Sequence, residues 1–279
     1  MSKKKKHNPS NKRSSNKDFQ KKPQKPKGNF EERKQGLDNR FILYGLHAVE
    51  AALLNKKRVI EKLYITDDHP FFSHSDIKEP FSKVNKEIKT RAQLDDLAGA
   101  GAVHQNVVAK IQPLQKFTLE EHLKALDLEE KNLYIMLDQV SDPHNIGAIM
   151  RSACAFGARG IIVQDKNAPE LNATIAKIAC GSADKIDYIS VTNLARSLET
   201  LKENGFWSVA LDERGEKDID QTVKGIENLV LVMGAEGPGL RPLVRKNCDL
   251  MAKLPTINKF WSLNVSNAAA IALYEAFKR

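Results

Sequence analysis

The sequence predicts an α/β protein with a parallel sheet that helices cover on both faces. Two observations predict it: short apolar segments alternate with helical segments from Leu133 onward, and these apolar segments are continuous rather than interrupted by polar residues. Continuous apolar strands are typical of parallel sheets that are buried on both faces. The expected strands are 134–137, 160–163, 188–191, 206–211, 229–233 and 251–255, and the expected helices include 146–156, 170–181 and 194–204.

A smaller α/β unit is predicted before this sheet, from Phe41 to about Pro113. It begins with a short strand, a turn at Gly45 and a helix, and strand-like segments follow at 60–65 and 106–111. Residues 84–97 combine helical and extended signals. The charged stretch 112–132 has leucines at helical spacing, so we expect a linker that contains one helix.

All of the net basic charge lies in the first 36 residues. They hold 13 of the 44 Lys and Arg residues and 3 of the 35 Asp and Glu residues, which leaves 31 basic and 32 acidic residues in a nearly neutral remainder. With almost no apolar residues, this tail cannot bury enough surface to fold alone. It is either a solubilising tail or a tether for a polyanion such as RNA, because lysines placed near phosphates release counterions.

The three cysteines, Cys154, Cys180 and Cys248, are widely spaced and form no CxxC pair. This pattern argues against a disulfide framework and a zinc site, and it indicates a reducing cytoplasm. Cys154 and Cys180 lie in apolar stretches, so we expect buried small hydrophobes rather than nucleophiles. We find neither a secretory or transit signal nor an apolar run of membrane-spanning length, and we expect no membrane partner.

Three polar segments follow expected strands, at the edge where open parallel sheets bind their ligands. The first contains Asn145 and Arg151, six residues apart at the start of a helix. Asn145 could simply cap this helix, and Arg151 could form an ion pair on its surface. His144 follows Asp-Pro, where a turn residue is more common than a general base.

The second segment, Gly234-Ala235-Glu236-Gly237-Pro238-Gly239-Leu240, follows the strand at 229–233. Its glycines allow the backbone to approach a ligand closely. A P-loop is excluded because no Gly-Lys-Ser/Thr follows, and the spacing does not fit a dinucleotide-binding fingerprint. An acid among glycines at a strand end, Glu236, favours a ligand site over a plain turn.

The third segment, Ser262-Leu263-Asn264-Val265-Ser266-Asn267, precedes an apolar helical run. Ser and Asn are typical helix caps, and free backbone N–H groups converge at such a helix start. Each segment alone has a plain structural interpretation. Together, at the ends of strands, the three segments predict one ligand site.

With these segments the chain resembles the SpoU (TrmH-type) family of RNA ribose 2'-O-methyltransferases, in the SPOUT superfamily. The matching motifs are 145–151, 234–240 and 262–266. Within the family, the chain is most similar to the bacterial enzymes that methylate a guanosine in 23S ribosomal RNA. Further similar segments are 44–49, 104–105, 193–195, 205–207 and 248–249, so the resemblance covers roughly 41–279.

Composition predicts a disordered basic tail at 1–37. The resemblance implies the parts that follow: an RNA substrate-binding domain with an L30e-like fold at 38–113, a linker at 114–131 and a SPOUT domain at 132–279 with a parallel sheet and a deep trefoil knot. It also implies a cytoplasmic homodimer that uses no metal, binds S-adenosyl-L-methionine in the knot and acts on 23S rRNA. Gly234, Leu254 and Leu263 are implied to contact the cofactor, largely through their backbones.

The reaction implied is direct methyl transfer from the sulfonium to a ribose 2'-hydroxyl. The resemblance gives Arg151, reaching over from the partner subunit, the task of helping to remove the hydroxyl proton. Arginine is a poor base at neutral pH, so stabilisation of the developing alkoxide fits at least as well. Asn145, Glu236, Ser262 and Asn264 are implied to orient Arg151, the ribose and the cofactor by hydrogen bonds.

The chain departs from its relatives at several positions, among them Asn106, Thr256, Asn258, Trp261 and Asn267. Asn258 suits a left-handed turn, where asparagine is the best residue after glycine. Trp261, beside Ser262, could reshape the pocket or stack on a base. Two alternatives to the 23S rRNA enzyme therefore stay open: a tRNA 2'-O-methyltransferase of the same family and a non-catalytic RNA-binding ribosome assembly factor.

Overall fold

The computed structural model describes residues 41–99, 101–115, 117–257 and 262–279. Its contacts divide the chain into Met1–Gln35 and Gly36–Arg279, and every described residue belongs to the second unit. The predicted basic tail and two of the departures, Asn258 and Trp261, lie outside the described residues. Among the helices of the described part, none is long and apolar enough to cross a membrane.

The first sheet has four strands in the order β1 (Ile42–Tyr44), β4 (Val107–Ile111), β2 (Ile60–Ile65) and β3 (Lys86–Ile88). Strands β1 and β2 run antiparallel to β4, and β3 runs parallel to β2. The helical segments of this unit are α1 (Leu46–Leu54), η2 (Pro70–Phe72), η3 (Ser75–Ile77), α2 (Lys78–Lys83) and α3 (Arg91–Ala98). The ambiguous stretch 84–97 thus contains a strand and a helix, and a capping box between Thr90 and Gln93 marks where α3 begins.

The expected linker helix is α4 (Leu119–Lys124), which begins at a capping box between Thr118 and Glu121. His122 fixes this helix to the second sheet, because its Nε2 lies 2.6 Å from Asp187 Oδ2 and its Nδ1 lies 2.9 Å from the Tyr134 hydroxyl. The linker is therefore bound to the sheet that follows it.

The second sheet has seven strands, all parallel, as the apolar segments predict. Their order is β7 (Asp187–Val191), β6 (Gly160–Gln164), β5 (Asn132–Asp138), β10 (Asn228–Gly234), β8 (Trp207–Leu211), β11 (Leu250–Lys253) and β9 (Lys217–Asp218). Strand β10 enters between β5 and β8, and its last residue, Gly234, lies opposite Asp138. The carboxyl ends of β5 and β10 therefore meet, which is where ligands bind in such sheets.

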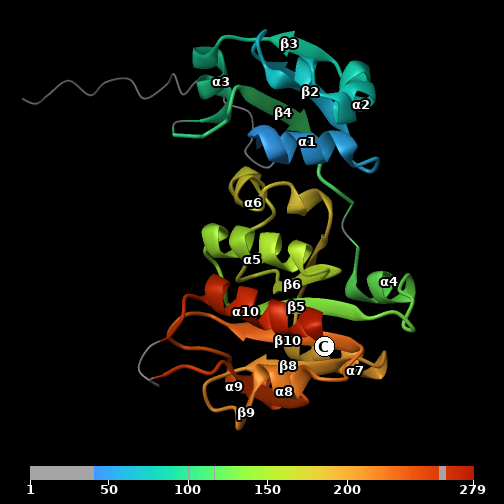
Figure 1. The fold of residues 1–279 in the computed structure, drawn as a ribbon, viewed down its shortest axis with the longest axis vertical. Helices are drawn as coiled ribbons and strands as arrows, with labels where there is room; N and C mark the ends of the chain where they lie inside the picture. Colours follow the sequence, from blue (N-terminus) through green and yellow to red (C-terminus); the bar gives the residue numbers. More distant parts are fainter. Residues whose placement is uncertain (1–40, 100, 116, 258–261) are drawn as a thin grey trace, which may run out of the picture. The chain divides into compact units, whose positions relative to one another are not determined.

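Helices cover both faces of this sheet (Figure 1). Along β5, Leu133, Ile135 and Leu137 pack in a cluster with α5 (Pro143–Ala155), α8 (Ile219–Val223) and α10 (Val265–Lys278). The intervening Tyr134 and Met136 pack in a second cluster with α4, α7 (Leu194–Glu203) and α9 (Pro242–Lys246). This alternation explains why the strand is apolar throughout. The helix expected at 170–181 is shorter, α6 (Ala173–Ile178), and a turn and η4 (Ser182–Asp184) follow it.

Candidate active site

The glycine loop after β10 folds back tightly on itself. A Cβ atom on Gly234 would lie 2.2 Å from the carbonyl carbon of Gly239 and 2.4 Å from the Leu240 nitrogen, so only glycine fits there. The Gly239 N–H donates to the Ala235 carbonyl at 3.0 Å, and Gly237 and Gly239 have φ angles of 82° and 66°. The loop is thus a compact backbone surface at the carboxyl end of the sheet.

An ion pair with a buried carboxylate anchors the far end of this loop. Asp138, the last residue of β5, is fully buried and accepts hydrogen bonds from the Arg241 backbone N–H at 2.8 Å and from Arg241 Nε at 2.7 Å. Arg241 also donates to Gln164 Oε1 at 2.8 Å. Sequence reasoning missed this pair, although an aspartate at the end of a buried strand and an arginine at the end of the motif were both visible.

Three of the predicted polar residues converge beside the loop. The side-chain amide of Asn264 donates to Glu236 Oε1 at 2.6 Å and to Asn145 Oδ1 at 3.1 Å. The Val265 backbone N–H donates to the same carboxylate oxygen at 3.2 Å. We call Asn145, Glu236 and Asn264 the amide–carboxylate cluster. It joins residues from three segments that the sequence placed at separate strand ends.

Asn264 is also the N-cap of α10. Its Oδ1 accepts from the Ser266 N–H at 2.9 Å and from the Ser266 hydroxyl at 2.5 Å, which confirms the expected cap. Asn145, by contrast, is not a cap: α5 begins at Pro143, and Asp142 caps it by accepting from the His144 N–H. That possibility was wrong because Asp142 and Pro143 already supply the helix start. Asn145 is free to face the cluster, while His144 is exposed.

Arg151 does not contact the amide–carboxylate cluster. Six residues along α5 from Asn145, it lies about 9 Å farther along the axis and about a third of a turn away around it. Its side chain is exposed, and its guanidinium donates to Cys180 Sγ at 3.4 Å. The expectation that Cys154 and Cys180 are buried was therefore too strong: both are only partly buried, and Cys180 is a hydrogen-bond acceptor. Cys248 is partly buried as well, and burial raises the pKa of its thiol to about 12.

The remaining predicted residues are Ser262, Leu263, Leu254 and Gly234. Ser262 and Leu263 directly precede Asn264, and both are exposed. Leu254 follows β11 and packs partly against the core. Gly234 is the last residue of β10, directly before the loop that carries Glu236. Among the described residues, we find no group of three or more His, Cys, Asp or Glu side chains that could hold a metal ion.

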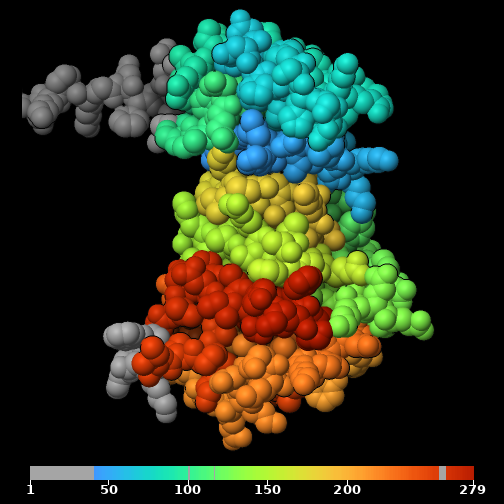
Figure 2. Space-filling model, in the orientation of Figure 1, coloured from blue at the N-terminus to red at the C-terminus, as the bar shows by residue number. Residues whose placement is uncertain are grey.

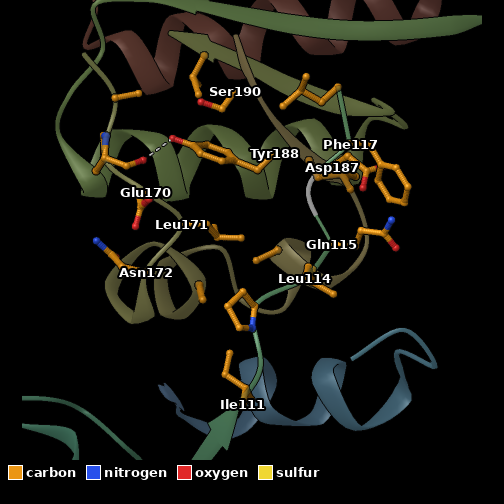
Figure 3. A pocket seen from close by; sticks show the side chains of 18 of the residues that line it. Ile111, Leu114, Gln115, Phe117, Glu170, Leu171, Asn172, Asp187, Tyr188 and Ser190 are labelled. Carbon is orange, nitrogen blue, oxygen red and sulfur yellow. Dashed lines mark hydrogen bonds between the residues drawn. The ribbon is translucent and has the colours of Figure 1, made fainter. Parts of the chain in front are cut away.

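A separate cavity of about 540 Å³ lies away from this cluster, between β1, the segment at 111–118 and the start of α6. Figure 3 shows Leu114, Leu171 and Tyr188 among the side chains around it. The Tyr188 hydroxyl donates to the Pro169 carbonyl at 2.8 Å, and burial raises the pKa of Tyr188. The cavity shares no residue with the three motifs.

Known sequences match this chain over nearly its whole described length. The sequence model of the SpoU rRNA Methylase family matches residues 132–274, and that of the RNA 2'-O ribose methyltransferase substrate-binding family matches 42–117. The 23S rRNA (guanosine-2'-O-)-methyltransferase RlmB of Vibrio parahaemolyticus is 40% identical over 248 residues, 87% of this chain and 98% of that protein. RlmB of Pseudomonas aeruginosa is 38% identical over 251 residues, 85% of this chain and 96% of that protein.

Solved structures share the fold. The SpoU methyltransferase AviRb from Streptomyces viridochromogenes, in complex with AdoMet, gives a TM-score of 0.72 at 23% identity and covers 86% of this chain and 90% of its own. The AdoMet-bound rRNA methyltransferase from Sinorhizobium meliloti gives 0.71 at 24% identity, over 86% of this chain and 87% of its own. Both the sequence matches and the three assembled motifs lead to one conclusion: the chain belongs to the SpoU rRNA methylase family.

Proposed function

We propose that the protein transfers a methyl group from S-adenosyl-L-methionine to the 2'-hydroxyl of a guanosine in 23S ribosomal RNA. The observation that carries this proposal is the amide–carboxylate cluster at the carboxyl ends of β5 and β10, beside a glycine loop with no room for a side chain. The substrate is suggested by relatives such as RlmB of Vibrio parahaemolyticus, which align over nearly their whole length.

The residues around the loop suit S-adenosyl-L-methionine. Gly234 lets the loop fold back onto its own backbone, and the backbone of this loop, together with Leu254 and Leu263, would contact the cofactor. Glu236 adds a negative charge near the position that a cationic sulfonium would occupy. When bound, the cofactor supplies an electrophilic methyl group, so the protein has only to place the ribose hydroxyl in line and to assist its deprotonation.

The roles of the polar residues follow from their contacts. Asn264 holds Asn145 and Glu236 in a fixed arrangement, and Ser262 beside it is free to donate to the ribose or cofactor. The guanidinium of Arg151 keeps its charge at neutral pH, so it would stabilise the alkoxide as the hydroxyl loses its proton. Because Arg151 lies apart from the cluster of its own chain, we infer that it completes the site of a partner subunit.

A homodimer is supported by the outer surface of α10. Ile271, Tyr274 and Phe277 are 43%, 47% and 60% exposed, and the rings of Tyr274 and Phe277 pack on Phe156 at the end of α5. The atoms of α10 lie uncovered on the face drawn in Figure 2. An apolar strip of this kind is typical of an interface between identical subunits. Arg151 lies on α5, the helix that ends directly before Phe156.

We further propose the domain boundaries 38–113, 114–131 and 132–279, with an L30e-like substrate-binding domain first and a deep trefoil knot in the last. The separate four- and seven-stranded sheets support the boundaries. The insertion of β10 between β5 and β8, and the packing of the later helix α10 against α5, are compatible with a knot. Three free cysteines suit a cytoplasmic protein.

The function is tested by incubating the purified protein with labelled S-adenosyl-L-methionine and 23S rRNA from a strain that lacks this gene. We expect one guanosine to gain a 2'-O-methyl group, mapped at nucleotide resolution. Total tRNA serves as the competing substrate. Methylation of tRNA alone would support the tRNA enzyme, and RNA binding without methylation of either substrate would support the assembly factor.

A further inference from the structure

The segment Lys177–Asp184, which we call the joint segment, connects the four-stranded unit to the helix that carries Arg151. Figure 1 shows α6, where the segment starts, between α1 and α5, and contacts link η4 to both of these helices. At its far end, Asp184 Oδ1 accepts from Arg58 Nε at 2.7 Å and from Asn55 Nδ2 at 3.0 Å. The Arg58–Asp184 pair is almost fully buried, with side chains 3% and 2% exposed.

The middle of the joint segment touches α1 without any gap. A Cβ atom on Gly181 would lie 2.7 Å from the Ala51 Cβ and 2.8 Å from the His47 carbonyl oxygen. Gly181 also has a φ angle of 85°, so both its conformation and its surroundings require glycine. A shift of α1 toward this turn would therefore displace the backbone at Gly181.

The start of the joint segment meets the loop at 104–106, which belongs to the four-stranded unit. Lys177 Nζ donates to Gln105 Oε1, which also accepts from the Leu46 backbone N–H at 3.1 Å. Gln105 and Asn106 have φ angles of 51° and 63°, and His104 Nδ1 accepts from the Asn106 N–H at 3.1 Å. This accounts for the departure at Asn106, since asparagine tolerates the left-handed conformation that glycine would otherwise supply.

Cys180 stands between these contacts and Arg151. It has a φ angle of 50°, unusual for a residue with a side chain, and it is followed directly by the left-handed Gly181. In this conformation its Sγ accepts from the Arg151 guanidinium at 3.4 Å. A constrained backbone therefore aims the thiol at the one side chain that the proposed reaction needs most.

We propose that Cys180 is a positioning residue for Arg151, and that the joint segment couples the seating of the four-stranded unit to the orientation of the guanidinium. This rests on the proposed function. Arg151 is long and exposed, so an acceptor that limits its rotamers raises the fraction of enzyme in the productive geometry. A shift of the four-stranded unit when RNA binds would reach Arg151 through Gly181 and Cys180.

The test compares Cys180→Ala and Cys180→Ser with Cys154→Ala, the matched control on α5 three residues from Arg151. We expect Cys180→Ala to lower the single-turnover methylation rate about tenfold, because a misplaced catalytic group costs rate rather than affinity. Serine, which still accepts a hydrogen bond, should restore most of the rate. Cofactor affinity, RNA affinity and melting temperature should stay at the wild-type values. A rate for Cys180→Ala equal to that of Cys154→Ala overturns the proposal.

A double-mutant cycle separates positioning from a general structural role. In an Arg151→Lys background, Cys180→Ala should add less than about a twofold further loss, because residues that act through one another are not additive. An undiminished tenfold loss in that background would show that Cys180 acts independently of Arg151.

A second pair of variants tests the coupling to α1. Gly181→Ala and Gly225→Ala both place a side chain at a positive φ, but Gly225 has no atom within 4 Å of its added Cβ. We expect Gly181→Ala to slow methyl transfer at saturating RNA well beyond Gly225→Ala, and this excess should vanish in a Cys180→Ala background. Equal rates for the two glycine variants would contradict the coupling.

One readout needs no activity and so separates this inference from the proposed function. Alkylation of each cysteine by iodoacetamide is followed by mass spectrometry in the wild type and in Arg151→Met. Loss of the guanidinium should change the alkylation rate of Cys180 several-fold, because the guanidinium contacts the sulfur atom that iodoacetamide attacks, while Cys154 serves as the internal reference. An unchanged Cys180 rate overturns the contact, whereas an inactive wild type with a changed rate counts against the function alone.

Discussion

The two polar parts of the site differ in how firmly the chain holds them. The glycine loop and the amide–carboxylate cluster are fixed by the fully buried Asp138, by Arg241 and by three hydrogen bonds to Glu236 and Asn145. Arg151 is exposed, and among the described residues its guanidinium donates to a thiol at 3.4 Å. The proposed cofactor side is thus organised by several contacts within one subunit, whereas the proposed catalytic cation is held by a single long hydrogen bond.

This difference has a chemical reason. A cofactor site gains affinity from a rigid backbone, because ordering it beforehand lowers the entropy lost on binding. A charged group that stabilises a transition state must meet a substrate that arrives separately.

The largest effect is expected from Asp138→Ala. It leaves Arg241, whose side chain is 33% exposed, without its carboxylate, so we expect a cost of about 3 kcal/mol, the lower end of the range for a buried pair. We expect this loss in the free energy of unfolding by urea, together with weaker cofactor binding as the loop loosens. Glu130→Ala, which breaks the more exposed pair with Arg159, should cost less than about 1 kcal/mol. Equal losses of unfolding free energy in the two variants would mean that Asp138 does not anchor the glycine loop.

Arg151→Ala should lower the single-turnover rate about 10²–10³-fold, the usual effect of removing one group that stabilises developing negative charge. The affinity for S-adenosyl-L-methionine, measured by calorimetry, should survive, because Arg151 lies outside the amide–carboxylate cluster. An equal loss of rate and of cofactor affinity would mean that Arg151 serves the same role as the amide–carboxylate cluster.

Asn264→Ala should weaken cofactor binding about tenfold, because it removes two hydrogen bonds from the cluster, and it should cost about 1 kcal/mol as a lost cap. Asn193→Ala is the matched control, since Asn193 caps α7 in the same way, accepting from Ala195 and Arg196 N–H groups away from the site. The control should lose stability and keep its affinity. A similar loss of affinity in both variants would point to general destabilisation.

The smallest signal is the most specific. At a cofactor concentration too low to load Asn264→Ala subunits, mixing and reannealing Arg151→Ala with Asn264→Ala subunits should restore about a quarter of wild-type activity, because random pairing gives half mixed dimers with one intact site each. This holds only if Arg151 serves the partner's cluster. Activity no higher than that of the separate variants would place Arg151 in the site of its own subunit.

The sequence was sufficient for the parts that local chemistry determines. Continuous apolar strands predicted the parallel sheet, and the polar segment 262–267 before an apolar run predicted the capped start of the last helix. Each of these depends on residues within one turn or strand. The helix at 146–156 was placed three residues late, because Asp142 and Pro143 were not recognised as its start.

Contacts between distant segments could not be predicted in the same way. Asp138 and Arg241 are 103 residues apart, and no sequence pattern in either segment indicates that the two side chains pair. Likewise, the six-residue spacing of Asn145 and Arg151 places them on different sides of α5, but it does not say what each side faces. That depends on β10 entering beside β5 and on the joint segment reaching Cys180.

Because Asn264 both starts the last helix and joins the amide–carboxylate cluster, the proposed site can form only after this residue has been translated. The residue that starts the last helix is the one that ties Glu236 to Asn145, and it is translated after both of them. A growing chain can therefore complete β5 and β10 and still lack the cluster. A message cut short before this codon would encode all seven strands of the second sheet but not the helix whose first turn completes the proposed site.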